Sequence, residues 1–405
     1  MTRTILVAIA LLPGFAEAAA DPPPTDMTRI FNESVARIRT DYVDVPSDQK
    51  LIGGCVSGMV AALDRYSSYI DKEKYDNLLN PKQTGVIGIE VRDRDGLIEV
   101  LTPFEGSAAA RGGILAGDVI VRIDAKPVTG LPLDEIIRLL RGDKGSRIKI
   151  AIVREGEAKA REFDLEREAY SPPIADGRLL AGNIAYVRLA RFSPDAMTLL
   201  ADQLKKLDKE AGSNVRGLVL DLRGNTGGLL PVSIGIAAAF LPTDAPIAEL
   251  RGRSKDVPMS LTAKKSNYVR GAFAPNPYEG VSEQVRQSVP LVVLVNGYTS
   301  SGAEIVAGAL QDNKRAIVVG SNTAGIGTIQ TLLPLGGNDG VLKLTTARYL
   351  TPKLRSFDGK GLVPDIVVEG ADRRTGERDA VLERALQQLP PLKAAQTDLF
   401  PRREQ

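Results

Sequence analysis

Residues 215–228 read VRGLVLDLRGNTGG, an apolar run that ends abruptly in a glycine-rich turn. The run has no polar alternation and is bounded by turn residues, which is typical of a strand buried on both faces. Two similar runs, at 290–296 and 315–320, follow it along the chain, with helical stretches among them. Strands that alternate with helices predict an α/β domain on a mostly parallel sheet, which we assign to residues 175–370.

The composition of the chain excludes several kinds of chemistry. The 405 residues are 43% hydrophobic and 25% charged, with a formal net charge of +2. Without a basic run or interleaved aromatic residues, this balance gives no indication of a nucleic-acid surface. The chain contains no histidine and a single cysteine, Cys55. Histidine-dependent nucleophilic mechanisms, internal disulfides and most zinc sites are therefore excluded, and we expect no metal and no other cofactor.

The N-terminus, MTRTILVAIALLPGFAEAAA, has the three parts of a secretory signal peptide. Arg3 precedes an apolar stretch at 5–15 and a small-x-small cleavage site at 16–18. A buried N-terminal helix is the alternative. No other run approaches the ~20 apolar residues that a membrane span needs. We expect residues 1–20 to be removed, and the mature protein to be periplasmic or secreted without a stable membrane span.

Two segments flank the rest of the chain and carry no recognisable chemistry. Residues 27–80 have helical spacing, which predicts a helical segment that caps the fold or mediates dimerisation. Residues 377–405 are predicted to form a last helix followed by a loose tail.

Residues 84–168 change to short strands and tight turns. Asp95-Gly96 joins two alternating apolar runs, which is a strong hairpin signal. The motifs GVIGI at 85–89, GDVI at 117–120 and RG at 141–142 follow in order. Together these features resemble a PDZ domain of the circularly permuted kind found in bacterial proteases.

A PDZ domain binds an extended C-terminal peptide as an added strand, and the N–H groups of a glycine turn hold the terminal carboxylate. A plain small β-domain with a glycine turn is the alternative. The resemblance implies a peptide site on the turn and on the facing helix, made of Val86, Ile87, Gly88, Ile89, Ile136 and Leu140.

Ser301 lies where a strand is predicted to turn into a helix. The stretch Ser301-Gly302-Ala303-Glu304 fits a capping box, which is its structural interpretation. In the functional interpretation Ser301 is a nucleophile, and the Gly302 N–H is an oxyanion donor at the helix start. The two interpretations are compatible, since a nucleophile can occupy a cap position.

The glycine turn at 224–228 offers a second group of oxyanion donors. It follows a buried strand, and ligands of α/β sheets bind at the carboxyl ends of strands. Gly227 and Gly228 could therefore direct a backbone N–H towards a developing oxyanion. An ordinary glycine-rich turn is the alternative.

These stretches together resemble the C-terminal processing peptidases, also called tail-specific proteases. The resemblance runs from Phe31 to Val368 and rests on ordered motifs: DRYSSYI, the embedded PDZ domain, DLRGNTGG, TSSGAEIVAGALQDNKRA, TIQT, LKLTTARYLTP and GKGLVPDI. It implies a crotonase-like α/β core, a Ser-Lys dyad with Ser301 as the nucleophile, and Gln330 as the residue that orients the lysine. It also implies protein substrates with apolar C-terminal tails. The protein could in addition form a homo-oligomer.

The chain departs from this family at Ile326. The family has glycine-lysine-glycine where this chain has Gly325-Ile326-Gly327, and that lysine is the general base. Isoleucine can neither accept the serine proton nor return it to the leaving amine. A nucleophile and its base act as a unit, so losing the base costs on the order of 10⁴–10⁶ in rate. Lys353, at a position where the family usually has a small residue, is a candidate substitute base.

Three functions follow from the sequence. The first is an exported C-terminal processing serine endopeptidase that cleaves by acyl transfer at Ser301, with its activity put in doubt by Ile326. The second is a catalytically impaired pseudo-protease that binds peptides through its PDZ domain. The third, a structural helper of an active homologue, has no specific sequence feature to support it.

Overall fold

The structure is a computed structural model, and it describes most of the chain between residues 25 and 390. The described ranges are 25–79, 84–94, 96–104, 106–131, 133–157, 159–170, 173–253, 259–271, 273–336, 339–368 and 379–390. The predicted signal peptide and the predicted tail beyond residue 390 lie outside them. The chain divides into two units, Met1–Leu63 and Asp64–Gln405, and each is considered by itself.

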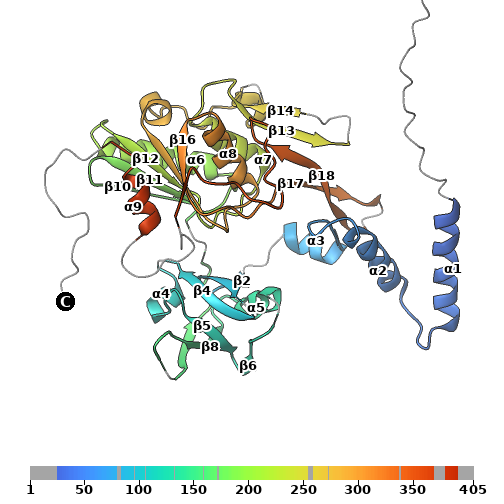
Figure 1. Ribbon diagram of the computed structural model, residues 1–405. Coiled ribbons are helices and arrows are strands. Elements are labelled where there is room, and N and C mark those ends of the chain that lie inside the picture. Colours follow the sequence, from blue (N-terminus) through green and yellow to red (C-terminus); the bar gives the residue numbers. More distant parts are fainter. Residues whose placement is uncertain are drawn as a thin grey trace, which may run out of the picture. The chain divides into compact units, whose positions relative to one another are not determined.

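The described part of the first unit, from residue 25, forms two helices, α1 (Thr25–Asp41) and α2 (Asp48–Ala61), drawn in blue in Figure 1. α2 begins at Ser47, whose hydroxyl accepts a hydrogen bond of 3.3 Å from the Lys50 N–H. Several large apolar side chains of these helices are exposed, namely Met27, Ile30, Phe31, Ile38, Ile52 and Met59. The helical segment predicted from residue 27 is therefore present, with much of its apolar surface uncovered in the single chain.

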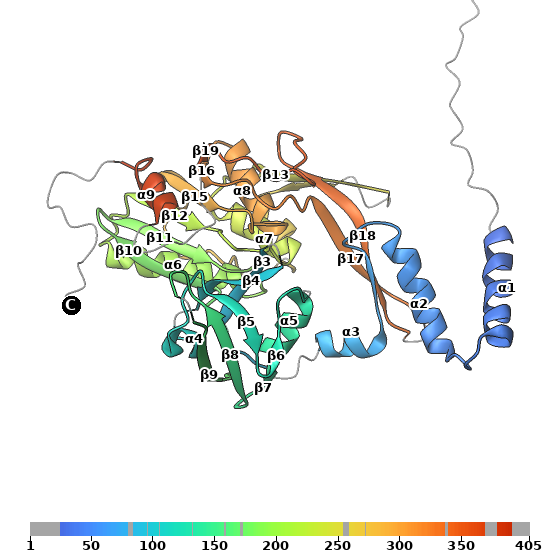
Figure 2. The ribbon, with the colours of Figure 1, turned by 60° about the horizontal axis from the view of Figure 1, so that its bottom comes forward.

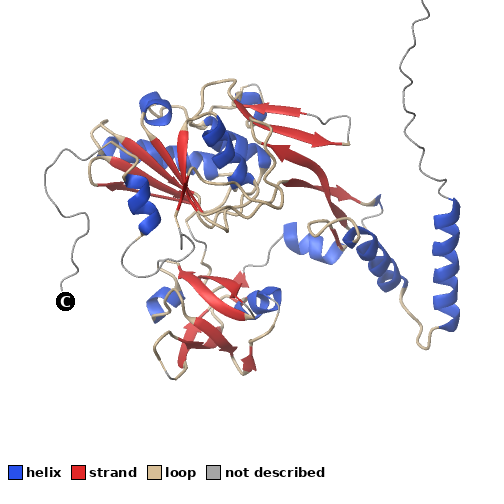
Figure 3. Cartoon of the chain, in the orientation of Figure 1, coloured by secondary structure: helices blue, strands red, loops and turns tan. Residues whose placement is uncertain are grey.

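The central sheet of the second unit contains the buried strands that the apolar runs predicted (Figure 3). Its order is β10-β11-β12-β15-β16-β19, and every pairing is parallel except that of β10 with β11. The bounds are β10 Ala175–Leu180, β11 Ile184–Leu189, β12 Gly217–Asp221, β15 Leu291–Val295, β16 Ala316–Gly320 and β19 Ile366–Val367. The mostly parallel α/β architecture is thus confirmed.

Helices cover both faces of this sheet, as α6 and α9 show in Figure 2. Leu218 and Leu220 of β12 point into the core formed with α6 (Ala196–Glu210), α7 (Leu230–Ala238) and α8 (Gly302–Asp312). Val219 points to the other face, where α9 (Ala380–Leu386) packs. Successive residues of a strand face opposite sides, which explains why these strands are apolar at every position.

A second sheet lies alongside, with the order β1-β18-β13-β14, and β17 also pairs with β18. Its strands are β1 Ser68–Ile70, β13 Pro246–Gly252, β14 Met259–Thr262, β17 Thr328–Pro334 and β18 Val341–Leu350. A 3₁₀ turn at Lys265–Asn267 and a π-helical turn at Gln284–Ser288 follow β14. β1 corrects the purely helical expectation for residues 27–80, of which Lys72–Leu79 forms α3. Three residues are too short for a pattern, and their partner strand is distant in sequence.

The PDZ stretch forms its own β-structure with a separate apolar core. The predicted hairpin is confirmed, with Arg94 opposite Leu97 across the turn. The strands are β2 Thr84–Gly85, β3 Ile89–Arg94, β4 Leu97–Pro103, β5 Val119–Ile123, β6 Lys126–Pro127, β7 Gly142–Asp143, β8 Arg147–Val153 and β9 Arg161–Glu166, and the helices are α4 Ala108–Gly112 and α5 Leu133–Leu140.

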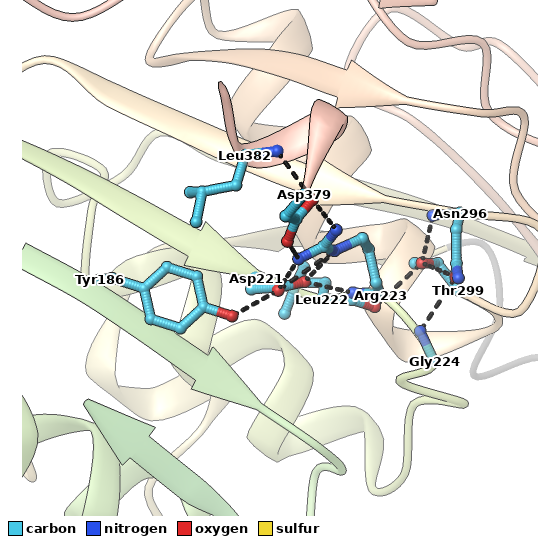
Figure 4. A network of polar contacts seen from close by, with 9 residues as sticks. All are labelled: Tyr186, Asp221, Leu222, Arg223, Gly224, Asn296, Thr299, Asp379 and Leu382. Carbon is cyan, nitrogen blue, oxygen red and sulfur yellow. Dashed lines mark hydrogen bonds and ion pairs between the residues drawn. The ribbon is translucent and has the colours of Figure 1, made fainter. Parts of the chain in front are cut away.

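A buried ionic network fixes the glycine-rich turn after β12 (Figure 4). The Arg223 guanidinium donates to the Asp221 carboxylate at 2.6 Å and to Asp379, the N-cap of α9, at 2.8 Å. The Tyr186 hydroxyl donates a further hydrogen bond of 2.6 Å to Asp221. Burial alone would lower the pKa of Arg223, but the two carboxylates outweigh it and hold that pKa above its usual range. The network therefore joins β12 to the last helix of the described chain.

Replacing Arg223 by methionine should lower the free energy of unfolding by about 3–5 kcal/mol, because a fully buried Asp221 carboxylate would lose its cation. Urea unfolding followed by circular dichroism measures this. Asp379→Asn is the milder comparison, since that carboxylate is 34% exposed and the inner ion pair survives. An Arg223→Met protein as stable as the Asp379→Asn protein would contradict the role of the network.

Candidate active site

Three loops meet at the carboxyl ends of β12, β15 and β16. The Thr299 hydroxyl donates to the Leu222 carbonyl at 2.9 Å, and the Ser300 N–H donates to the Asn225 carbonyl at 2.9 Å. The Ala324 N–H donates to the Thr299 carbonyl at 3.0 Å. The structure therefore places the glycine-rich turn, the segment that leads into Ser301 and the segment that leads into Ile326 against one another.

Ser301 has an unusual backbone conformation at the start of α8. Its φ is 53° and its ψ is −119°, a region that residues with side chains rarely adopt. The turn also needs a glycine next, because a Cβ at Gly302 would lie 2.2 Å from the Ser233 hydroxyl oxygen. A strained serine between a strand and a helix start is the arrangement that exposes a nucleophile.

Glu304 clamps the Ser301 turn to the loop that carries Ile326. One carboxylate oxygen accepts the N–H groups of Ser301 at 2.8 Å and Ile326 at 2.9 Å. The other accepts the Gly325 N–H at 2.8 Å and the Thr323 hydroxyl. The side chain is fully buried, and burial raises its pKa against the lowering effect of these four donors. The predicted capping box is present, and its glutamate fixes the loop of Ile326 as well.

The hydroxyl of Tyr349, near the end of β18, lies beside the Ser301 turn. It donates to the Ile326 carbonyl, and Glu304 joins the backbone of Ile326 to that of Ser301. Tyr349 is only 1% exposed, and burial together with the nearby Glu304 carboxylate raises its pKa well above the ordinary value. Tyr349 is therefore a neutral phenol and not a base. The sequence analysis missed this contact, which no spacing indicates.

The expected oxyanion donors are brought together, but they are not equally available. A Cβ at Gly227 would lie 2.5 Å from the Gly302 nitrogen, so the glycine-rich turn and the start of α8 pack backbone to backbone. The Gly227 N–H donates to the Asn225 side-chain oxygen at 2.8 Å, which makes it unsuitable as the donor that we expected. Gly228 and Gly302 remain the candidates. An asparagine two residues before the amide that it caps is a known turn signal.

Gln330 lies on β17 in a network of hydroxyl groups. Its side-chain amide donates to the hydroxyls of Thr328 at 2.8 Å and Thr345 at 3.3 Å. The Thr345 N–H in turn donates to the Ser67 hydroxyl at 3.0 Å. Gln330 is therefore held by Thr345 of β18, a residue that the DRYSSYI segment binds through Ser67, and its orienting role stays a prediction.

Lys353 does not have the setting of a substitute base. Its side chain is exposed, and its backbone N–H donates to the Asp312 carboxylate at 2.9 Å. Asp312 is the last residue of α8, whereas Ser301 lies at the start of that helix, about 15 Å away at 1.5 Å per residue. A general base must lie within hydrogen-bond reach of the serine that it activates.

The PDZ domain has a pocket of about 430 Å³ at the predicted glycine turn. Gly88 has a φ of 76°, and a Cβ there would lie 2.3 Å from the Ser107 Cβ, so only glycine fits. The helix contributes Ile137 and not the expected Ile136, which is fully buried in the PDZ core. One residue turns a helix by about 100°, which is enough to exchange the two faces. The pocket is lined by Val86, Ile87, Gly88, Ile89, Glu90, Val91, Phe104, Ile137, Leu140, Arg141, Tyr170 and Arg191.

Among the described residues, no group of three or more histidine, cysteine, aspartate or glutamate side chains could hold a metal ion. None of the helices within these ranges has the length and apolarity to cross a membrane.

The chain matches known families over two stretches. Residues 183–368 match Peptidase family S41, and residues 99–154 match the PDZ domain. The chain is similar to a carboxy-terminal-processing protease of Bartonella bacilliformis, 38% identical over 342 residues that span 84% of this chain and 74% of the relative. It is also similar to the carboxy-terminal processing protease CtpA of Bacillus subtilis, 31% identical over 349 residues, 84% of this chain and 69% of the relative.

Solved structures share the fold. The photosystem II D1 C-terminal processing protease is 25% identical, with a TM-score of 0.58 over 86% of this chain and 93% of that one. An S41 protease structure from Bacteroides fragilis is 17% identical, with a TM-score of 0.54 over 92% of this chain and 98% of that one. The predicted α/β protease core with an inserted PDZ domain is therefore confirmed.

Replacing Glu304 by glutamine should lower the free energy of unfolding by about 2–3 kcal/mol. The carboxylate now accepts hydrogen bonds from four donors. A glutamine NH₂ group would place its own hydrogens against two of these donors, which would lose their acceptor. Thermal unfolding measures the loss. The matched control is Glu210→Gln on α6, an exposed carboxylate 3.8 Å from Lys206. Equal melting temperatures for the two variants would show that Glu304 does not clamp the loops.

Proposed function

We propose that this chain, which belongs to peptidase family S41 and within it to the carboxy-terminal processing proteases, binds protein tails at a peptidase site that has little activity. Its PDZ domain would bind the C-terminal tail of a protein. The serine-peptidase site would then receive the chain without cutting it efficiently.

The observation that carries this proposal is the pair of residues held next to the Ser301 turn, Ile326 and Tyr349. A serine needs a group that takes its proton as it attacks the peptide carbonyl. Position 326 offers an apolar side chain, and the hydroxyl bound to its carbonyl belongs to Tyr349, a buried, neutral tyrosine. Neither group accepts a proton near neutral pH.

Slow peptidase activity is the second candidate, and a specific observation favours it. The strained Ser301 backbone and the close packing of Gly227 on Gly302 are both present. Oxyanion stabilisation and substrate binding alone leave a residual rate over water of about 10³–10⁴ in other serine peptidases. Acyl transfer at Ser301 would then proceed slowly, with a water molecule accepting the proton of the serine hydroxyl.

The setting of the protein is also part of the proposal. The signal-like sequence at 1–20 supports export to the periplasm or beyond. The exposed apolar side chains of α1 and α2 would be covered in a homo-oligomer, which supports self-association through these helices. Protein substrates with small or apolar tails fit the apolar part of the PDZ pocket.

Replacing Ile326 by lysine should raise peptidase activity by roughly 10²-fold or more, because it supplies the general base. The backbone of this residue is already fixed on both sides by Glu304 and Tyr349. The measurement is cleavage of an unfolded protein with an apolar C-terminus, followed by gel electrophoresis and mass spectrometry.

Two controls make this result specific. Ile326→Met has a similar volume and accepts no proton, so it should stay at the wild-type level. Adding Ser301→Ala to Ile326→Lys should abolish the gain. A folded Ile326→Lys protein that cleaves no faster than the methionine variant would mean that another feature silences the site.

Peptides with a free terminal carboxylate should bind at least tenfold more tightly than the same peptides as amides, a difference of about 1.4 kcal/mol. The amide lacks the charge that the glycine turn at 86–88 would hold. Calorimetry with the full chain and a peptide that ends in small apolar residues measures this. Equal affinities for acid and amide would overturn tail recognition by the PDZ domain.

A further inference from the structure

The PDZ pocket is not lined by the PDZ domain alone. Val86, Ile87 and Gly88 form its glycine turn, and Ile137 and Leu140 form its apolar wall. Two more lining residues lie outside the predicted domain, which ends at residue 168: Tyr170 follows it directly, and Arg191 lies in the α/β core just after β11.

Tyr170 brings the connecting segment against the glycine turn. Its ring stacks on Phe104 with centroids 6.0 Å apart, and a Cβ at Gly88 would lie 3.2 Å from its ring. The chain that leaves the PDZ domain therefore returns past the position where a terminal carboxylate would be held.

The core and the PDZ domain also touch elsewhere in this unit. The Arg92 guanidinium donates to the Tyr298 hydroxyl at 3.1 Å, and Arg92 pairs with Glu99 at 2.7 Å. Both members of that ion pair are 16% exposed on their side chains. A Cβ at Gly224 would lie 3.3 Å from a Glu90 carboxylate oxygen. Arg191 thus reaches the pocket as one of several core residues near β3.

The charges around the pocket favour an anion. Arg141, just after α5, and Arg191 contribute two guanidinium groups, and Glu90 contributes one carboxylate. A guanidinium presents paired donors that match a carboxylate, and such charge-assisted bonds are stronger than neutral ones. The two arginines outnumber the carboxylate of Glu90, so the net charge of the pocket lining is positive towards the carboxylate of a ligand.

We propose that Arg191 of the core completes the carboxylate site of the PDZ domain. The free α-carboxylate of a protein tail is held by the glycine turn at 86–88 together with Arg141 and Arg191, while Ile137 and Leu140 take the last side chain. This inference rests on the proposed tail recognition and adds to it a contact from outside the PDZ fold. The ligand is a terminal carboxylate next to a small or apolar residue.

The alternative is that Arg191 reads an acidic side chain further up the tail. Glu90 lines the same pocket on β3, the strand along which an added peptide would run. A carboxylate there repels an acidic side chain of the tail. The glycine turn of the same pocket can also hold a terminal carboxylate, which favours that group as the partner of Arg191.

The test compares acid and amide peptides on the full chain with and without Arg191. A fluorescent peptide of about ten residues that ends in small apolar residues is titrated into wild type, Arg191→Met and Arg251→Met. Arg251 is an exposed arginine of the core on β13 and controls for the loss of one positive charge. Arg191→Met should weaken binding of the acid about tenfold and of the amide less than twofold. Arg251→Met should change neither.

The outcomes separate this inference from the function on which it rests. Wild-type protein that binds acid and amide equally overturns tail recognition itself. Wild type that prefers the acid, with Arg191→Met unchanged, overturns only the role of Arg191. Equal losses for acid and amide in Arg191→Met show that the arginine contacts another part of the tail, which also overturns it. Arg191→Lys should recover part of the acid preference, and a variant that recovers none while folded counts against a charge-based role.

Discussion

The buried ion network of Asp221, Arg223 and Asp379 is the constraint on which the site depends. It holds the first residues of the glycine-rich turn against the last helix, at the edge where three parallel strands end. A charge without its partner in this interior would cost several kcal/mol, so the turn has one stable position. Everything that packs on the turn, including the start of α8 and the loop of Ile326, is placed relative to that fixed edge.

The site separates the parts that shape the backbone from the part that moves a proton. Glu304 binds four donors from two loops and stabilises the geometry whatever side chain occupies position 326. Tyr349 adds a second support from β18. The geometry of a serine peptidase can therefore persist after its base is gone. Sequence similarity to the carboxy-terminal processing proteases establishes the family, whereas in our proposal the reaction depends on one side chain.

Much of the fold could be predicted because local sequence patterns indicate it. Apolar runs predicted the parallel strands, and Asp95-Gly96 predicted the hairpin. Two contacts between distant segments were not predictable, the pairing of Ser68–Ile70 with β18 and the Tyr349 hydroxyl on the Ile326 carbonyl. The Asn225 side chain on the Gly227 amide is a local turn contact, and the sequence analysis did not use it. Ile136 and Ile137 are neighbours on one helix and point in different directions. Hydrophobic periodicity shows roughly which side of a helix is buried, but it does not resolve the direction of each single residue. Ser301 was predicted from its place between a strand and a helix and then from the family motifs, whereas Ile326 and Gln330 were identified through the family motifs alone, and their chemical roles stay predictions.

The way position 326 is held has an evolutionary consequence. Its amide and carbonyl are bound by Glu304 and Tyr349, so the loop keeps its course without help from the side chain. A change there carries little penalty in stability, and lysine and isoleucine codons can differ by a single nucleotide. Lineages that carry this architecture could lose the cutting reaction and regain it in one genetic step. The capacity to hold a protein tail, which resides in a different domain, would be inherited intact through both changes.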